Sequence, residues 1–194
     1  MDAPSAIGLF FPTLRQLTVE NTGHARLKSM NQSLAFNVFF PFDEDGFLVL
    51  VSPEHYDGFV GADWTLSQLL DRFVEQMNFG NAFIAYPGDD AANEPFQLVN
   101  RHGAGRIVRE ASGTLRVGAA GLRLTSYTQL TMAAQFQDED AAEPQNSLHL
   151  PCAPGVYRVS LRELAGAVSS FELEIQPTDN ATPVQHKTVP WFGS

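Results

Sequence analysis

Apolar and polar residues alternate with a period of two along much of this chain, which is the pattern of half-buried β-strands. The clearest case is residues 171–176, where Phe-Glu-Leu-Glu-Ile-Gln places the apolar side chains on one face of a strand and the polar ones on the other. Most of the chain is therefore predicted to form strands. Further strands are predicted at 34–40, 47–51, 82–86, 96–99, 114–117, 122–125, 129–136 and 156–161, with turns at 45–46, 87–88, 112–113, 118–121 and 154–155.

One segment carries a helical pattern instead. Thr65 and Gln68 have the spacing of a capping box, and the apolar residues that follow recur three and four positions apart. Gly80 comes shortly after the last of them, where a left-handed residue commonly ends a helix. We predict one amphipathic helix at about residues 65–79, with the apolar side chains Leu66, Leu69, Leu70, Phe73, Val74 and Met77.

These elements predict a mainly β protein of the α+β class, an antiparallel sandwich or bent sheet with the helix packed on it. A chain of 194 residues fits one domain, and two lobes, 1–87 (α+β) and 95–194 (β), are the alternative. The acidic stretch 137–145 is expected to be a solvated connection between strands. The apolar run 7–11 is expected to be a core strand or an exposed edge, and the aromatic pair Trp191-Phe192 is expected to dock onto the body.

The negative charge of the chain is confined to one region. Residues 43–94 hold eleven acidic residues and a single basic one, Arg72, which together account for the whole net charge of −10. Five arginines then follow within residues 101–123. An acidic pole on the surface favours a basic partner. The acidic pI of about 4.8 argues against binding to nucleic acid, because phosphates require a cationic surface.

Two motifs resemble parts of catalytic or phosphate-binding sites. Cys152 and His149 would suit a nucleophile and its base, but residues three apart in a strand point to opposite faces, so a small buried thiol is expected. Residues 102–106 contain Gly-x-Gly flanked by basic residues. A strand pattern rather than a helix follows them, so we expect a turn and not a phosphate-binding loop.

The densest group of polar functional side chains is Glu-His-Tyr-Asp at residues 54–57, with Asp63 nearby. It lies between a predicted strand and the predicted helix, which is a common position for sites. The spacing matches no known metal-ligand pattern, and the chain contains neither G-x-S-x-G nor S-x-x-K. We therefore expect no catalytic residues, no metal site and no cofactor.

The cellular compartment is predicted from three features. Cys152 is the only cysteine, so no intramolecular disulfide is possible, and no apolar run approaches the roughly 18–20 residues that a membrane span needs. The first residues, Met-Asp-Ala-Pro, place an acid where a secretory signal carries positive charge. A cytoplasmic protein that does not contact membranes is expected.

The leading hypothesis is a non-enzymatic binding protein that engages a basic protein, specifically an immunity or antitoxin-type inhibitor that occludes the cationic cleft of a bacterial nuclease or nucleic-acid deaminase. One alternative is a ligand-binding or hydrolytic β-protein with a site near His55 and Asp57; another is a structural accessory subunit. The sequence leaves the oligomeric state open. The predicted contact residues are Asp43, Glu44, Asp45, Glu54, Tyr56, Asp57, Asp63, Trp64, Asp71, Glu75, Asp89 and Asp90.

Overall fold

A computed structural model describes residues 34, 36–167, 169–179 and 184–193, all of which belong to one compact unit spanning Gln32–Ser194. This unit contains a five-stranded and a four-stranded sheet with two α-helices. The predicted fold class, mainly β with a packed helix, is confirmed. The predicted strand at 7–11 lies outside the described residues.

The five-stranded sheet has the order β1-β4-β9-β8-β5. All neighbours in it are antiparallel except β4 and β9, which are parallel. The sequence pattern locates these strands well, although β5 and β8 are longer than predicted. Their bounds are β1 Val38–Pro41, β4 Pro95–Val99, β5 Arg106–Val117, β8 Gly155–Ala165 and β9 Phe171–Pro177.

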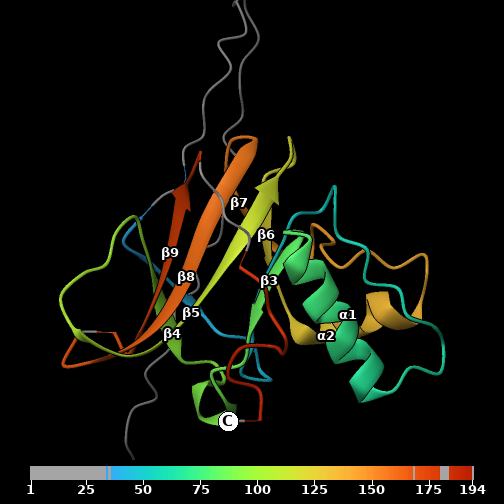
Figure 1. Cartoon of the computed structure of the whole chain (residues 1–194), viewed down its shortest axis with the longest axis horizontal. Helices are drawn as coiled ribbons and strands as arrows, with labels where there is room; N and C mark the ends of the chain where they lie inside the picture. The colour runs from blue at the N-terminus through green and yellow to red at the C-terminus, as the bar shows by residue number, and fades with distance from the viewer. Residues whose placement is uncertain (1–33, 35, 168, 180–183, 194) are drawn as a thin grey trace, which may run out of the picture. The chain divides into compact units, whose positions relative to one another are not determined.

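The four-stranded sheet has the order β3-β2-β6-β7 and is entirely antiparallel. Figure 1 shows the helices on one side of this sheet and the five-stranded sheet on its other side. Every residue of β2 and β3 is buried, because both faces of this sheet are covered. The strands are β2 Leu48–Val51, β3 Ala82–Ala85, β6 Leu122–Thr125 and β7 Leu148–Leu150.

The helix α1 spans Leu66–Asn78 and confirms the predicted helix. Its capping box is formed: the Gln68 N–H donates to Thr65 Oγ1 at 3.4 Å, and the Thr65 N–H donates to Gln68 Oε1 at 2.8 Å. Gly80 has φ +74°, as its position after the helix requires. Leu69, Phe73 and other members of the apolar stripe enter the core.

The strand predicted at 129–136 is wrong, because this segment forms the helix α2, Tyr127–Gln135. Ser126 caps it by accepting a hydrogen bond from the Gln129 N–H at 3.2 Å. Leu130, Ala133 and Ala134 are buried on the face that this spacing creates. The acidic stretch 137–145 therefore connects a helix to β7, and not two strands.

The turn predicted at Ser112–Gly113 is also wrong, because both residues lie inside β5, which pairs without a break through them. A Cβ atom at Gly113 would lie 2.6 Å from Cδ2 of Phe83. Close packing against this ring, and not a reversal of the chain, explains the glycine. The remaining short elements are β7, which the sequence did not predict, and a 3-10 turn η1 at Asp89–Ala91.

The core lies between the two sheets and under the helices, and it is rich in phenylalanine. The Phe42 ring centroid lies 5.0 Å from the centroids of both Phe96 and Phe171. The C-terminal aromatic pair docks as predicted: Trp191 and Phe192 are partly buried against the core, and the Tyr86 N–H donates to the carbonyl of Pro190 at 3.0 Å.

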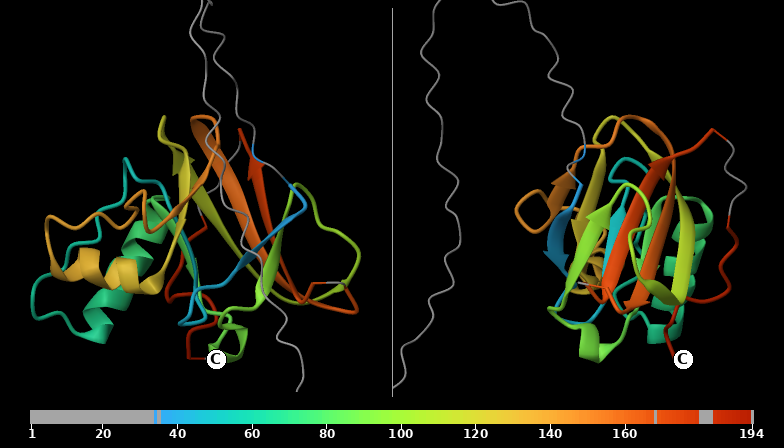
Figure 2. Two further views of the ribbon diagram at one scale, coloured as in Figure 1. Left: turned by 180° about the vertical axis from the view of Figure 1, so that it is seen from behind. Right: turned by 90° about the vertical axis from the view of Figure 1, so that its left-hand side faces the viewer.

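Both sheets combine strands from before and after residues 88–95, as the two views of Figure 2 show. The division of the whole chain into one domain or two lobes stays a prediction. Among the described residues, no helix is long and apolar enough to cross a membrane.

Candidate functional site

Asp43 begins a tight turn between β1 and β2 and fixes it with its carboxylate. Its Oδ1 accepts hydrogen bonds from the N–H groups of Asp45 at 3.1 Å and Phe47 at 2.6 Å, and its Oδ2 accepts from the N–H of Tyr127 at 2.7 Å. Burial raises the pKa of Asp43 above its usual value, against these backbone N–H groups, which lower it. The carboxylate thus joins the turn to the start of α2. Beside it, Glu44 is exposed and Asp45 is half-buried.

A second acidic loop lies against this turn although it is distant in sequence. The turn residue Gly46 abuts Gly88, because a Cβ atom at Gly46 would lie 2.3 Å from the Gly88 carbonyl oxygen. The Asn93 N–H also donates to the Asp43 carbonyl at 3.3 Å. Five acids therefore share one region. We call them the acidic loop pair: Asp43, Glu44, Asp45, Asp89 and Asp90.

Tyr86 provides the aromatic side chain of the acidic loop pair. Its ring packs on Phe47 with centroids 4.6 Å apart, and its hydroxyl donates to Asp89 Oδ1 at 2.5 Å. The hydrogen bond to Asp89 is the main cause that raises the pKa of Tyr86. Sequence reasoning missed Tyr86, because it stands at the end of a buried strand and looks like a core residue.

The acids of the acidic loop pair are not neutralised by nearby bases. Throughout the described part of the chain, Glu75 is the one acid of residues 43–94 that forms an ion pair, with Arg72 at 2.7 Å. Arg109 does reach this end of the molecule, since it donates to the carbonyl of Pro87 at 2.7 Å. Its guanidinium is nevertheless occupied by Glu163, at 2.5 Å.

Four other predicted contact residues lie around α1. Asp71 and Glu75 are exposed on the helix, and together with Arg72 they line a shallow surface pocket. Asp57 is exposed in the preceding loop, which is tied to α1 by a hydrogen bond from the Asp57 N–H to Gln76 Oε1 at 3.1 Å. Asp63 is also exposed in this loop. No hydrogen bond or ion pair joins these acids to the acidic loop pair in the described structure.

The Glu54 carboxylate forms hydrogen bonds within the protein. Its two carboxylate oxygens accept hydrogen bonds from the N–H groups of Ala119 and Ala120, each at 3.0 Å. They hold the turn at 118–121, whose ends form an isolated β-bridge. Glu54 thus stabilises a connection between β5 and β6 and lies apart from the acidic loop pair.

The two predicted aromatic contacts, Tyr56 and Trp64, are half-buried and pack against the core. The Tyr56 hydroxyl oxygen is buried and has no hydrogen-bond partner among the described residues, and burial raises the pKa of Tyr56. Asp57 and Asp140 line a pocket of about 250 Å³ beside it. His55 is exposed and does not line that pocket.

The remaining candidates for chemistry are Cys152, His149 and residues 102–106. Cys152 is buried, and burial raises the pKa of its thiol to about 11, which keeps it protonated at neutral pH. His149 is exposed. Residues 102–106 are not followed by a helix, since β5 begins at Arg106, as predicted. Within the described ranges, no group of three His, Cys, Asp or Glu side chains has the geometry to hold a metal ion.

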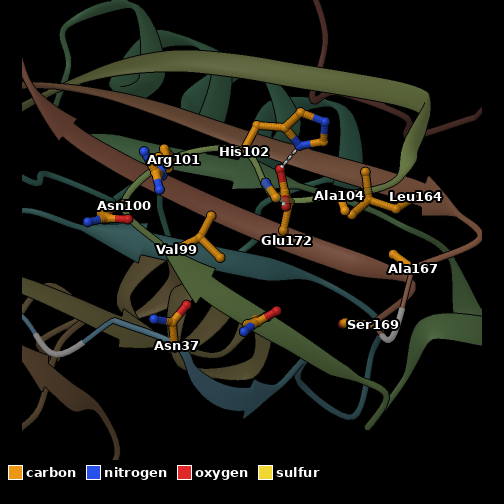
Figure 3. Close-up of a pocket in the computed structure, with 12 residues that line it drawn as sticks. Asn37, Val99, Asn100, Arg101, His102, Ala104, Leu164, Ala167, Ser169 and Glu172 are labelled. Carbon is orange, nitrogen blue, oxygen red and sulfur yellow. Dashed lines mark hydrogen bonds and ion pairs between the residues drawn. The ribbon is translucent and has the colours of Figure 1, made fainter.

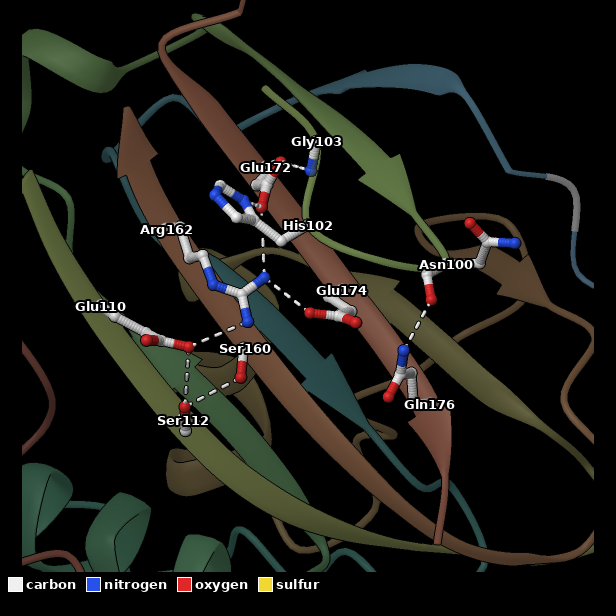
Figure 4. A network of polar contacts seen from close by, with 10 residues as sticks. All are labelled: Asn100, His102, Gly103, Glu110, Ser112, Ser160, Arg162, Glu172, Glu174 and Gln176. Atoms are coloured by element: carbon white, nitrogen blue, oxygen red, sulfur yellow. Dashed lines mark hydrogen bonds and ion pairs between the residues drawn. The ribbon is translucent and has the colours of Figure 1, made fainter. Parts of the chain in front are cut away.

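Sequence reasoning also missed a polar network on the outer face of the five-stranded sheet, which Figure 4 shows. Glu172 belongs to the polar stripe of β9 and yet is only 3% exposed. Its Oε1 lies 3.1 Å from Arg162 Nη1, and it also contacts His102 Nδ1. Arg162 in turn binds Glu174 at 2.6 Å and Glu110 at 3.0 Å. Cross-strand register, which periodicity does not give, brings these residues together.

Comparison with known proteins adds little. No protein-family model matches the sequence, and no curated protein sequence matches it. Among solved structures, the chain is similar to one titled "Crocagin biosynthetic gene J", at 10% identity and a TM-score of 0.41, covering 73% of this chain and 96% of that chain. This similarity carries no argument about function. The class of the protein rests on its own geometry, a two-sheet β protein with an acidic loop pair at one end.

Proposed function

We propose that this chain is a non-enzymatic binding protein that engages a basic partner protein through the acidic loop pair. The observation that carries the proposal is the unneutralised charge of these five acids on two adjoining loops. The acids of the five-stranded sheet behave differently, since four of them are paired with Arg109, Arg162 or His102. Carboxylates left without a basic partner at one end are able to steer and bind a cationic surface.

The specific form of the proposal is an immunity or antitoxin-type inhibitor acting in the cytoplasm. A toxin that cleaves or deaminates nucleic acid needs a positive cleft for phosphates. Carboxylates held on a rigid turn imitate those phosphates at little entropic cost, because Asp43 already fixes the turn with three hydrogen bonds. Tyr86 supplies an aromatic group beside them, of the kind enriched at the centres of protein interfaces.

The test uses two variants of equal charge. Glu44→Lys/Asp90→Lys reverses two exposed acids of the acidic loop pair while leaving the structural Asp43 intact. The control, Asp138→Lys/Glu139→Lys, makes the same change of net charge in the exposed stretch that follows α2. The tagged protein is purified from its host at low salt and analysed by native mass spectrometry. The association rate of any captured partner with each variant is then measured against ionic strength.

A stoichiometric basic partner whose association slows by about ten-fold or more with the first variant, and clearly less with the control, is the expected result. The expected difference between the variants also shrinks as salt is raised. Equal effects of both variants, or purification of the protein with no basic partner, would contradict the proposal. A bound small molecule and an activity lost in His55→Ala would support the alternative site near Asp57 instead.

A further inference from the structure

A pocket of about 610 Å³ lies on the polar side of the five-stranded sheet. The loop between β4 and β5 forms one wall, Asn37 at the start of β1 forms another, and Leu164 and Ser169 close it near the β8–β9 connection. Figure 3 shows the side chains around it. None of its lining residues belongs to the acidic loop pair, so the pocket is independent of the proposed function.

A buried carboxylate organises one side of this pocket. Glu172 Oε2 accepts a hydrogen bond from the Gly103 N–H at 3.2 Å, and Oε1 contacts both Arg162 and the Nδ1 atom of His102 (Figure 4). Glu172 therefore holds the β4–β5 loop against the sheet and fixes the orientation of the imidazole. The other ring nitrogen, Nε2 of His102, has no partner among the described residues and belongs to an exposed side chain.

The pocket also contains a cation without a carboxylate partner. Arg101 is exposed and makes no ion pair within the described ranges. The charge of Glu172 is offset by Arg162, and the two other acids of that network, Glu110 and Glu174, bind Arg162 and do not line the pocket. Three amide side chains complete the polar lining: Asn37, Gln97 and Asn100.

We propose that this pocket binds a small organic or inorganic anion, one that carries a carboxylate or phosphate group. The anionic group binds the Arg101 guanidinium, because Arg101 lines the pocket and pairs with no carboxylate in the described structure. The amides of Asn37, Gln97 and Asn100 bind the polar remainder of the ligand, since each supplies both donors and an acceptor. Glu172 is a positioning residue that orients His102 and does not contact the anion.

The test titrates the full chain with inorganic phosphate and, separately, with succinate, at constant ionic strength set by sodium chloride. The readout is the imidazole resonance of His102, assigned by comparison with His102→Gln. Arg101→Ala removes the proposed anion contact, and Arg158→Ala is the matched control, because Arg158 is an exposed arginine on β8 that does not line the pocket. Circular dichroism verifies that both variants fold.

A saturable shift with at least one of the two anions is expected, with an affinity that Arg101→Ala lowers by about ten-fold and Arg158→Ala leaves unchanged. Binding of phosphate alone identifies a phosphate-bearing ligand, and binding of succinate alone identifies a carboxylate. The proposal is overturned if neither anion gives a saturable shift, or if the two arginine variants weaken binding equally.

Discussion

Replacing Arg162 with methionine is expected to destabilise the fold strongly. The Arg162 side chain is 11% exposed and binds three carboxylates, and one of them, Glu172, has a side chain that is only 4% exposed. Methionine is similar in length and keeps the apolar contacts of the arginine stem, so the change removes mainly the charge and its hydrogen bonds. Glu172 would remain buried beside Glu174 without its strongest partner.

The expected loss is about 3–5 kcal/mol, the usual cost of breaking a buried ion pair by removing one partner. Against a typical total stability of about 5–15 kcal/mol, this is a large fraction.

Urea unfolding followed by circular dichroism at pH 7.5 measures this loss. The control is Arg158→Met, two pleats away on the same face of β8, at an exposed arginine that forms no ion pair in the described structure. It should cost less than about 0.5 kcal/mol. If Arg162→Met costs no more than the control, the network does not stabilise the fold in the way inferred.

Three further predictions concern single side chains. Glu54→Ala should cost about 1 kcal/mol and speed hydrogen exchange at the N–H groups of Ala119 and Ala120, because it removes both of their acceptors; unchanged exchange would contradict this role. Burial lowers the pKa of His186. The neutral imidazole therefore contributes its full stabilisation above the unfolded pKa of about 6.5, and this stabilisation is lost as the pH falls below that value. His186→Gln should therefore flatten the fall of melting temperature between pH 7 and 5, and equal slopes would argue against it. Cys152, with its pKa raised to about 11 by burial, should react with a thiol reagent at pH 8 much more slowly in the folded protein than in urea, and equal rates would show that it is accessible.

The sequence by itself determined the elements whose physics is local. The strand β9 follows from strict alternation, and α1 follows from its stripe of apolar residues and the capping box of Thr65, because each signal lies within a few neighbouring residues. The same local logic failed at residues 129–136. Leu130 and its neighbours fit either element, and the segment is helical where Ser126 caps it and Asp43, far away in the sequence, accepts the Tyr127 N–H.

Only the tertiary structure decided which charged residues meet. The confinement of the acids to residues 43–94 was visible in the sequence. Sheet order and loop packing decided that Asp43 and Asp89 share one end, while Glu54 holds a turn elsewhere. Burial of Glu172 was equally invisible, because its place in a polar stripe predicts exposure. Its partner Arg162 comes from the neighbouring strand, and cross-strand register, a property of the whole sheet, is what brings the two together.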